Sequence, residues 1–331
     1  MANRQSDPDT PFVTSDWASV ANVHRFAHQA MATTFEIIVQ YEERLYAQQA
    51  AEAAFDELDR IEGELSRYIE NSDVARLNNL PANQPLQLGL DTYACLDISK
   101  QMHARTNGVF DVTIGFLLDC WRDEDKRPRV PAADELAFAR RHTGMDLLVL
   151  DEATTMVALR AGPVRVDLGG VGKGYGVDRM AELLREWSVD RALIHGGFSS
   201  VLALDAPEGA RGWPVTLSHP QDRRRVLARL ELERMAVSGS GLEKGGHIID
   251  PRLGRPVEGK IAAWSVTPNA GVGDAFSTAF MIMAPAEIEA LCAQDSAVRA
   301  LVIVRDEDAD ASRERVLPIG AWTKTELLGY D

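Results

Sequence analysis

The alternation of hydrophobic and polar positions predicts helices and strands that follow one another without a fixed period. Apolar residues spaced by threes and fours predict helices at residues 42–68, 91–105, 131–141, 174–187, 274–283 and 285–293. Short β-rich runs predict strands at residues 35–39, 147–150, 156–159, 164–166, 192–194, 215–217, 225–232, 262–266 and 300–304. Because no regular strand–helix–strand repeat is present, the pattern favours the α+β class over a doubly wound parallel sheet.

The same pattern predicts how the chain divides into domains. Residues 1–22 are polar and contain prolines, which predicts a loose, flexible N-terminal arm. From residue 23 to residue 331 the chain has no internal repeat, no low-complexity tract and no clear linker. We therefore expect residues 23–331 to form a single domain.

Composition and charge exclude several classes of function. The chain has 331 residues, with 35 Lys plus Arg against 50 Asp plus Glu, and a formal net charge of −15. Nucleic-acid binders usually carry a basic face, so we expect no nucleic-acid partner. No signal-peptide core, lipobox cysteine or run of 18 apolar residues occurs, which predicts a cytoplasmic protein without a membrane anchor. The three cysteines lack a CxxC spacing and are expected to be buried in the core.

A glycine-rich turn at residues 166–175 follows a predicted strand and opens a predicted helix. Glycines let backbone N–H groups approach a ligand, a helix N-terminus favours negative charge, and Lys173 adds a cation, so this segment can hold a phosphate. It is not a Walker A loop, because Asp167 stands where that motif needs Gly and Gly174 where it needs Ser or Thr. A tight structural turn remains the alternative interpretation.

Two further segments combine residues that could bind a metal or move a proton. Asp274 and Thr278 are four residues apart and share one helical face, where a carboxylate and a hydroxyl can hold a hard cation such as Mg²⁺. His247 offers a group that titrates near neutral pH, and Asp250, before a proline turn, offers a fixed carboxylate. The alternatives are that Asp274 only caps its helix and that His247 and Asp250 are structural.

In their order and spacing these segments resemble the ApbE family of flavin transferases, the FAD:protein FMN transferases, over about residues 24–304. The resemblance is carried by Met31-Ala32-Thr33, Ser66-Arg67-Tyr68, residues 72–78, Gly108 to Thr113, Asp167 to Tyr175 with Asp178, Gly196-Gly197, His247 to Pro251 and Asp274 to Ala279. It implies an ApbE-like α+β fold of largely antiparallel sheets packed with helices, with FAD in a cleft between two lobes.

The resemblance also implies an activity: Mg²⁺-dependent transfer of FMN from FAD to a threonine hydroxyl of a target protein, through a phosphoester bond, with release of AMP. Gly170, Asp274 and Thr278 match the metal ligands of the family. The FAD-contacting positions are matched by Met31, Tyr68, Val109, Phe110, Asp111, Asp167, Lys173, His247 and Ile248. Since phosphoryl transfer depends on neutralising phosphate charge, Mg²⁺ and Lys173 would supply that charge. His247 is the candidate general base, and Asp250 is the candidate residue that orients it.

Three positions depart from the family pattern. Ala32, Phe198 and Val237 stand where Gly, Asn or Asp, and Thr are common in the family, and all three are expected near the flavin. These changes could alter cofactor affinity or the choice of target protein. Two other functions therefore stay open: an FAD pyrophosphatase that uses water to give FMN and AMP, and a protein that binds FAD without turnover.

Overall fold

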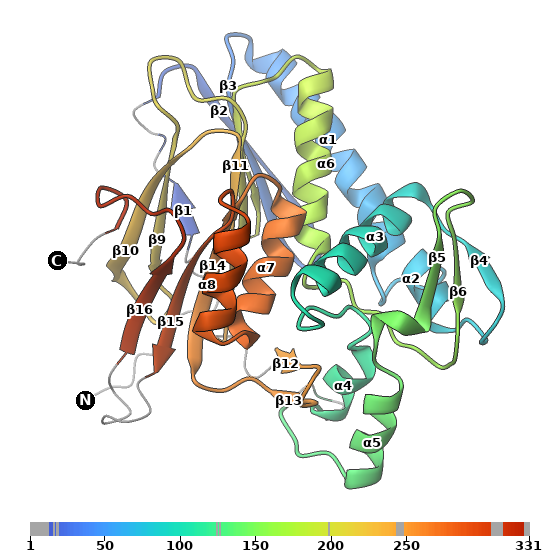
Figure 1. Ribbon diagram of the computed structural model, residues 1–331. Coiled ribbons are helices and arrows are strands. Elements are labelled where there is room, and N and C mark those ends of the chain that lie inside the picture. Colours follow the sequence, from blue (N-terminus) through green and yellow to red (C-terminus); the bar gives the residue numbers. More distant parts are fainter. Residues whose placement is uncertain are drawn as a thin grey trace.

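The computed structural model describes residues 13–15, 17, 20–123, 125, 127–197, 199–242, 248–305 and 314–327. An eight-stranded sheet lies at its centre, in the order β16-β15-β14-β11-β8-β7-β3-β2, and every neighbouring pair is antiparallel (Figure 1). The strands are β2 (Val23–Ala30), β3 (Thr33–Gln40), β7 (Ala192–Gly196), β8 (Ser200–Ala203), β11 (Met235–Gly241), β14 (Lys260–Thr267), β15 (Arg299–Arg305) and β16 (Glu314–Ile319). The α+β prediction with largely antiparallel sheets is confirmed.

Both faces of this sheet are covered by other elements, and alternate residues along its strands pack against one cover or the other. Helices α1 (Arg44–Leu65), α6 (Gly172–Glu186), α7 (Ala270–Ile282) and α8 (Pro285–Gln294) cover one face (Figure 1). A three-stranded sheet of β1 (Val13–Ser15), β9 (Trp213–His219) and β10 (Asp222–Leu232) covers the other. In β15, Ala300 and Val302 pack on the helical side, whereas Leu301 and Ile303 pack on the side of the small sheet.

The remaining elements lie beside the helical face. They are α2 (Asp73–Asn78), α3 (Leu90–Arg105), α4 (Gly115–Cys120), α5 (Ala133–Arg141), the 3₁₀ turn Met145–Leu147, the sheet of β4 (Pro85–Gln87), β6 (Met156–Leu159) and β5 (Leu148–Asp151), and the hairpin of β12 (Ile249–Asp250) and β13 (Arg255–Pro256). One hydrophobic cluster joins Leu96 of α3 and Val157 of β6 to Phe276 of α7 and Val302 of β15. This shared core supports the proposal that the chain from residue 23 onward folds as one domain.

Most predicted elements are present within a few residues of their expected bounds, and the exceptions have physical reasons. Residues 164–166 form no strand, because only Arg165 pairs, as an isolated bridge to Ile114. Strand β11 was not predicted, because its sequence MAVSGSG shows no alternation of hydrophobic and polar positions. Most of its residues are small and buried. The prediction of a loose arm over residues 1–22 is wrong for Val13–Ser15, which pairs with β9.

Two further expectations concern the burial of the cysteines and the presence of membrane-spanning helices. Cys95, Cys120 and Cys292 are buried and form no disulfide, as the sequence predicts. Burial raises the pKa of the Cys120 and Cys292 thiols to about 11, which makes both unreactive at neutral pH. None of the helices in the described part of the chain is long and apolar enough to cross a membrane.

The turn between β2 and β3 leads to a prediction for stability. Met31 and Ala32 connect the paired residues Ala30 and Thr33, with φ angles of 49° and 57°. Two-residue hairpin turns of type I′ require positive φ at both central residues, and a residue with a Cβ loses roughly 1–2 kcal/mol there. Glycine loses about 0.5–1 kcal/mol more chain entropy on folding, so Ala32→Gly should stabilise the protein by up to about 1 kcal/mol. Urea unfolding measures this free energy, and a lower midpoint for the variant would contradict the expectation.

Candidate functional site

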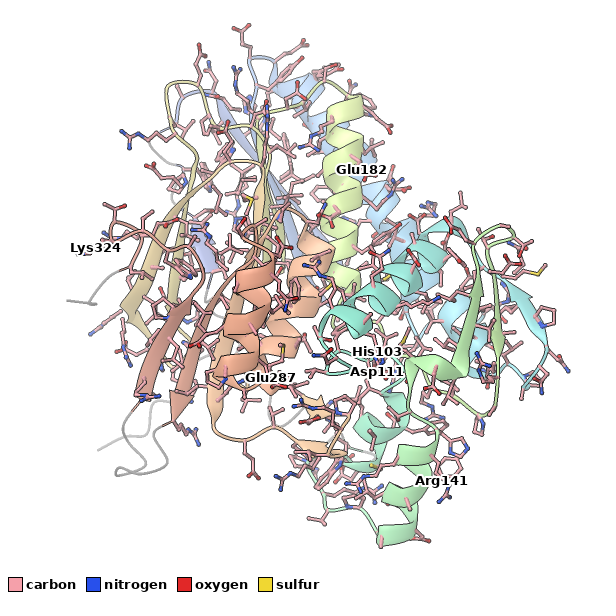
Figure 2. The ribbon with its side chains drawn as sticks, viewed as in Figure 1. His103, Asp111, Arg141, Glu182, Glu287 and Lys324 are labelled. Carbon is pink, nitrogen blue, oxygen red and sulfur yellow. The ribbon has the colours of Figure 1, made fainter. Side chains whose placement is uncertain are left out.

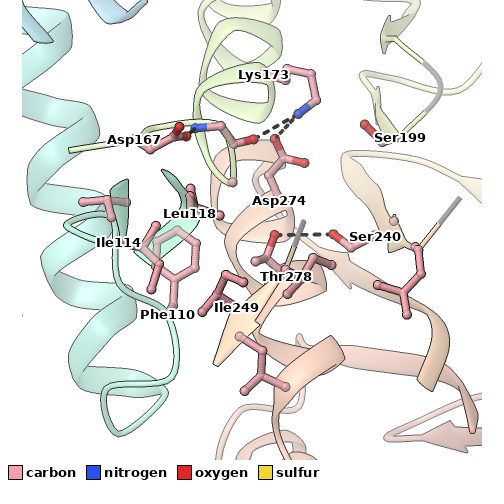
Figure 3. A pocket seen from close by; sticks show the side chains of 18 of the residues that line it. Phe110, Ile114, Leu118, Asp167, Lys173, Ser199, Ser240, Ile249, Asp274 and Thr278 are labelled. Carbon is pink, nitrogen blue, oxygen red and sulfur yellow. Dashed lines mark hydrogen bonds and ion pairs between the residues drawn. The ribbon is translucent and has the colours of Figure 1, made fainter. Parts of the chain in front are cut away.

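A cavity of about 970 Å³ opens where the loops after α3 and β6 face α7 and the end of β11. Its lining includes Met31, Tyr68, Val109, Phe110, Asp111, Asp167, Gly170, Lys173, Ile248, Asp274 and Thr278. Figure 3 shows Asp167, Lys173, Asp274 and Thr278 around the same space; Asp167 lies in the loop after β6, Lys173 on α6, and Asp274 and Thr278 on α7. Of the site residues predicted from the sequence, Asp250 lies outside this lining, and His247 lies outside the described residues.

Asp250 is engaged by its own turn. Its carboxylate accepts a hydrogen bond from the Arg252 backbone N–H at 2.8 Å and pairs with the Arg252 guanidinium at 3.2 Å. The backbone N–H of Gly254 donates to the Asp250 carbonyl at 2.7 Å, which closes the turn after β12. The alternative structural interpretation of Asp250 therefore has direct support. Its orienting action on His247 stays a prediction.

The candidate metal ligands come from two segments about a hundred residues apart in the sequence. Asp274 and Thr278 lie one helical turn apart on α7, and the Asp274 side chain is only 5% exposed. Gly170 stands opposite them, since a Cβ built on it would lie 3.4 Å from Thr278 Oγ1. The sequence could predict the pair on α7 from its spacing, but only the fold brings the glycine-rich turn against it.

These ligands fit a hard cation that keeps part of its water shell. A carboxylate, a hydroxyl and a nearby backbone carbonyl are all oxygen donors, which Mg²⁺ prefers. Among the described residues, no group of three Asp, Glu, His or Cys side chains is placed to hold a metal. Mg²⁺ usually binds through one or two carboxylates plus water and substrate phosphates, so this sparse ligand set suits it.

Asp274 does not cap its own helix, so the capping alternative is wrong in that form. Helix α7 begins at Ala270, and the N–H groups of Ala270 and Gly271 donate to the Asp178 carboxylate of α6, both at 2.8 Å. In return, Asp274 Oδ2 accepts from the backbone N–H of Gly174, at the start of α6, at 2.9 Å. Each helix therefore supplies the carboxylate that caps the other.

This mutual capping requires the two helix starts to lie very close together. A Cβ on Gly174 would be 2.1 Å from the Ala270 carbonyl oxygen, so only glycine fits at that position. Asp178 is partly buried at this junction, and the loss of solvent around its carboxyl raises its pKa to about 6. Together the contacts fix the position of Lys173 relative to Asp274.

Lys173 lies at the first turn of α6 and faces the cavity. Its Nζ donates to the Gly169 carbonyl at 3.2 Å and is 3.8 Å from Asp274 Oδ2 (Figure 3). The side chain is 27% exposed, so the ammonium group remains accessible to a ligand. A cation at a helix N-terminus, next to a glycine-rich turn, is a suitable arrangement for an anionic phosphate.

An ion-pair network on the wall of the cavity includes residues that the sequence did not single out. Asp119 of α4 accepts from Arg67 Nη2 at 2.7 Å and also pairs with Arg165. Arg67 Nη1 lies 3.2 Å from Asp167 Oδ2, and Asp167 Oδ1 accepts from the Gly169 N–H at 2.8 Å. This chain of contacts connects the cavity wall to the glycine-rich turn. Asp119 and Arg165 lie in segments without a motif, so no sequence signal identified them.

The other predicted contacts line the cavity in different ways. Phe110, with Ile114, Leu118 and Ile249, provides apolar surface next to the polar cluster (Figure 3). Tyr68 is 73% exposed, with the Arg67 guanidinium 5.1 Å from its ring centre. A planar ring could stack on this exposed face, since aromatic groups prefer such contacts.

The Asp111 carboxylate accepts hydrogen bonds from several neighbouring residues, which indicates a mainly structural role. Its Oδ1 accepts from the Thr113 N–H and hydroxyl, at 2.8 and 2.5 Å, and its Oδ2 accepts from the Met145 N–H at 3.2 Å. His103 Nδ1 of α3 lies 3.5 Å from the same carboxyl (Figure 2). Burial raises the pKa of Asp111. These bonds shape the loop at residues 109–113 that forms one side of the cavity.

Comparison with known proteins identifies the family of this chain. The model of the ApbE family matches residues 31–302. A protein of Klebsiella pneumoniae named FAD:protein FMN transferase is 28% identical over 71% of this chain and 70% of its own length. One of Vibrio cholerae with the same name is 26% identical over 84% of this chain and 86% of its own length.

Solved structures show the same fold. The flavin transferase ApbE of Vibrio cholerae superposes with a TM-score of 0.77 at 22% identity, covering 90% of this chain and 97% of the other. The apo flavinyl transferase ApbE of Pseudomonas stutzeri gives a TM-score of 0.76 at 24% identity, covering 90% of this chain and 94% of the other. Because the family model spans most of the sequence and the solved relatives share its fold, this chain belongs to the ApbE family.

Proposed function

We propose that this protein transfers FMN from FAD to a threonine hydroxyl of a target protein, in a reaction that depends on Mg²⁺ and releases AMP. The observation that carries the proposal is the convergence of Lys173, Asp274 and Thr278 in one large cavity of an ApbE-family chain. Relatives named FAD:protein FMN transferase support FAD as the donor and a protein as the acceptor. We infer the metal from the oxygen donors of Asp274, Thr278 and Gly170, and the acceptor threonine from the family resemblance alone.

The proposed reaction is a phosphoryl transfer, in which one bond to phosphorus forms and another breaks. The threonine oxygen forms a bond to the phosphorus of the FMN half, and the bond from that phosphorus to the bridging oxygen breaks, so AMP leaves. The threonine proton passes to a general base, for which His247 is the candidate. When bound at Asp274, Thr278 and the Gly170 carbonyl, Mg²⁺ supplies positive charge to the phosphate oxygens.

The residues of the chain then have separate tasks. Lys173 places a second positive charge beside the phosphates, which favours the charge that develops as the bond breaks. The apolar surface around Phe110 and the exposed ring of Tyr68 offer contacts to the flavin or adenine ring.

Incubation with FAD, Mg²⁺ and threonine-containing candidate acceptor domains tests this function. We expect AMP in solution and an acceptor whose mass rises by one FMN minus water, with both signals lost when EDTA removes the metal. Free FMN together with AMP in the absence of any acceptor would instead indicate a pyrophosphatase. A stable yellow protein whose FAD persists in Mg²⁺ would indicate binding without turnover.

A further inference from the structure

The carboxylate of Asp274 has a second partner that comes from a strand, not a helix. Ser200 is the first residue of β8, and its Oγ donates a hydrogen bond to Asp274 Oδ1 at 2.8 Å. Ser200 is fully buried and Asp274 is 4% exposed, so water does not compete for this bond. The contact joins the central sheet directly to the candidate metal ligand.

The two hydrogen bonds of Asp274 hold its two oxygens separately. Gly174 N–H binds Oδ2 from helix α6, and the Ser200 hydroxyl binds Oδ1 from β8. A carboxylate held at one oxygen can still rotate about its Cβ–Cγ bond, whereas one held at both oxygens cannot. Each oxygen has two lone-pair sites, so each keeps one that is not used by these donors.

We propose that Ser200 is a positioning residue that fixes the Asp274 carboxylate in the orientation needed to bind the metal. This inference rests on the proposed function, because it assigns Asp274 to Mg²⁺. A group that hydrogen-bonds to a metal-binding side chain typically contributes about 10–100-fold to metal affinity. Ser200 is fully buried and does not line the cavity, so it acts through Asp274.

The neighbouring hydroxyl groups do not duplicate this contact. Ser277 Oγ donates to the backbone carbonyl of Asp274 at 2.9 Å, not to its carboxylate. Ser240 Oγ lies 2.8 Å from Ser277 Oγ and 3.4 Å from Thr278 Oγ1. Removing the Ser200 hydroxyl would therefore leave Oδ1 without its donor.

The test compares Ser200→Ala with Ser265→Ala. Ser265 is equally buried, and its hydroxyl donates to the Gly273 carbonyl of the same helix at 2.7 Å without contacting the Asp274 carboxylate. Mn²⁺, which prefers similar oxygen ligands, serves as the probe, with free Mn²⁺ measured by electron paramagnetic resonance and Mg²⁺ added as competitor. Thermal unfolding midpoints are measured for the same samples.

We expect Ser200→Ala to weaken Mn²⁺ binding by about 10-fold or more, and Ser265→Ala to leave it within about twofold of the unchanged protein. Both variants should lower the unfolding midpoint by similar amounts, and Ser200→Thr, which keeps the hydroxyl, should restore the affinity. Equal Mn²⁺ affinity in Ser200→Ala and the unchanged protein would overturn the positioning role. If the unchanged protein bound no Mn²⁺ or Mg²⁺, the metal assignment itself would be wrong, and this role would fall with it.

Discussion

Replacing Asp274 with asparagine should reduce FMN transfer by about 10²–10³-fold and abolish the response to Mg²⁺, because the metal loses its only carboxylate ligand in the proposed set. Asparagine is preferable to alanine at this position. Its amide oxygen can accept from the Gly174 N–H while its amide nitrogen donates to Ser200 Oγ, so both buried groups keep a partner. Initial rates of AMP release across a Mg²⁺ titration measure the effect.

The structure changes what is expected of Asp274→Ala. A carboxylate that only capped its own helix would contribute about 0.5–2 kcal/mol to stability. Alanine would instead leave the Gly174 N–H and the Ser200 hydroxyl unpaired in the interior, and each such group costs about 1–3 kcal/mol. Loss of activity in the alanine variant would therefore mix metal loss with unfolding.

Asp178→Asn provides the matched control for Asp274→Asn. Asp178 is also a carboxylate that accepts backbone N–H bonds at the junction of α6 and α7, but it does not line the cavity. We expect this control to lose stability while keeping its Mg²⁺ response. An Asp274→Asn protein with a rate within tenfold of the unchanged protein and a normal Mg²⁺ response would show that Asp274 is not a ligand.

Replacing Lys173 with methionine should lower the rate of FMN transfer by about 10²–10³-fold, the usual effect of removing one group that stabilises developing charge. Methionine keeps most of the length of the side chain and removes only the ammonium group, which lies 3.8 Å from Asp274 Oδ2. Single-turnover measurements with saturating FAD separate the chemical step from binding. The fold should tolerate the change, because the ammonium group is partly exposed and its contacts with described residues are one hydrogen bond to the Gly169 carbonyl and the long ion pair with Asp274.

Lys100→Met removes the same charge from an exposed position on α3 and controls for the change in net charge. We expect this control to keep the normal rate. If Lys173→Met transferred FMN as fast as Lys100→Met, charge neutralisation by Lys173 would not contribute to the reaction. A change confined to the KM for FAD would assign Lys173 to binding alone.

Some elements of the fold can be predicted from local sequence patterns, and others form only because a partner strand lies beside them. The apolar stripe of α1 and the β-rich run of β3 are local patterns, and both elements occur close to where they were expected. Strand β11 has small polar residues at buried positions, which makes sense only once β8 and β14 pair with its two edges. Val13–Ser15 likewise forms a strand only because β9 is available beside it.

The candidate site, like the fold, has parts that the sequence predicts and parts that only the structure shows. By itself the sequence determined the α+β class, the glycine-rich turn with Lys173, the pair Asp274 and Thr278, and through the resemblance the family; the FAD-contacting positions stay a prediction. These features depend on residue type and on spacing within one helix or turn. Only the tertiary structure decided that Asp178 and Asp274 each cap the other helix, that Ser200 holds Asp274, and that Arg67 and Asp119 support the turn. Those contacts join segments far apart in the chain, and their geometry depends on how closely α6, α7 and β8 pack, which no local pattern records.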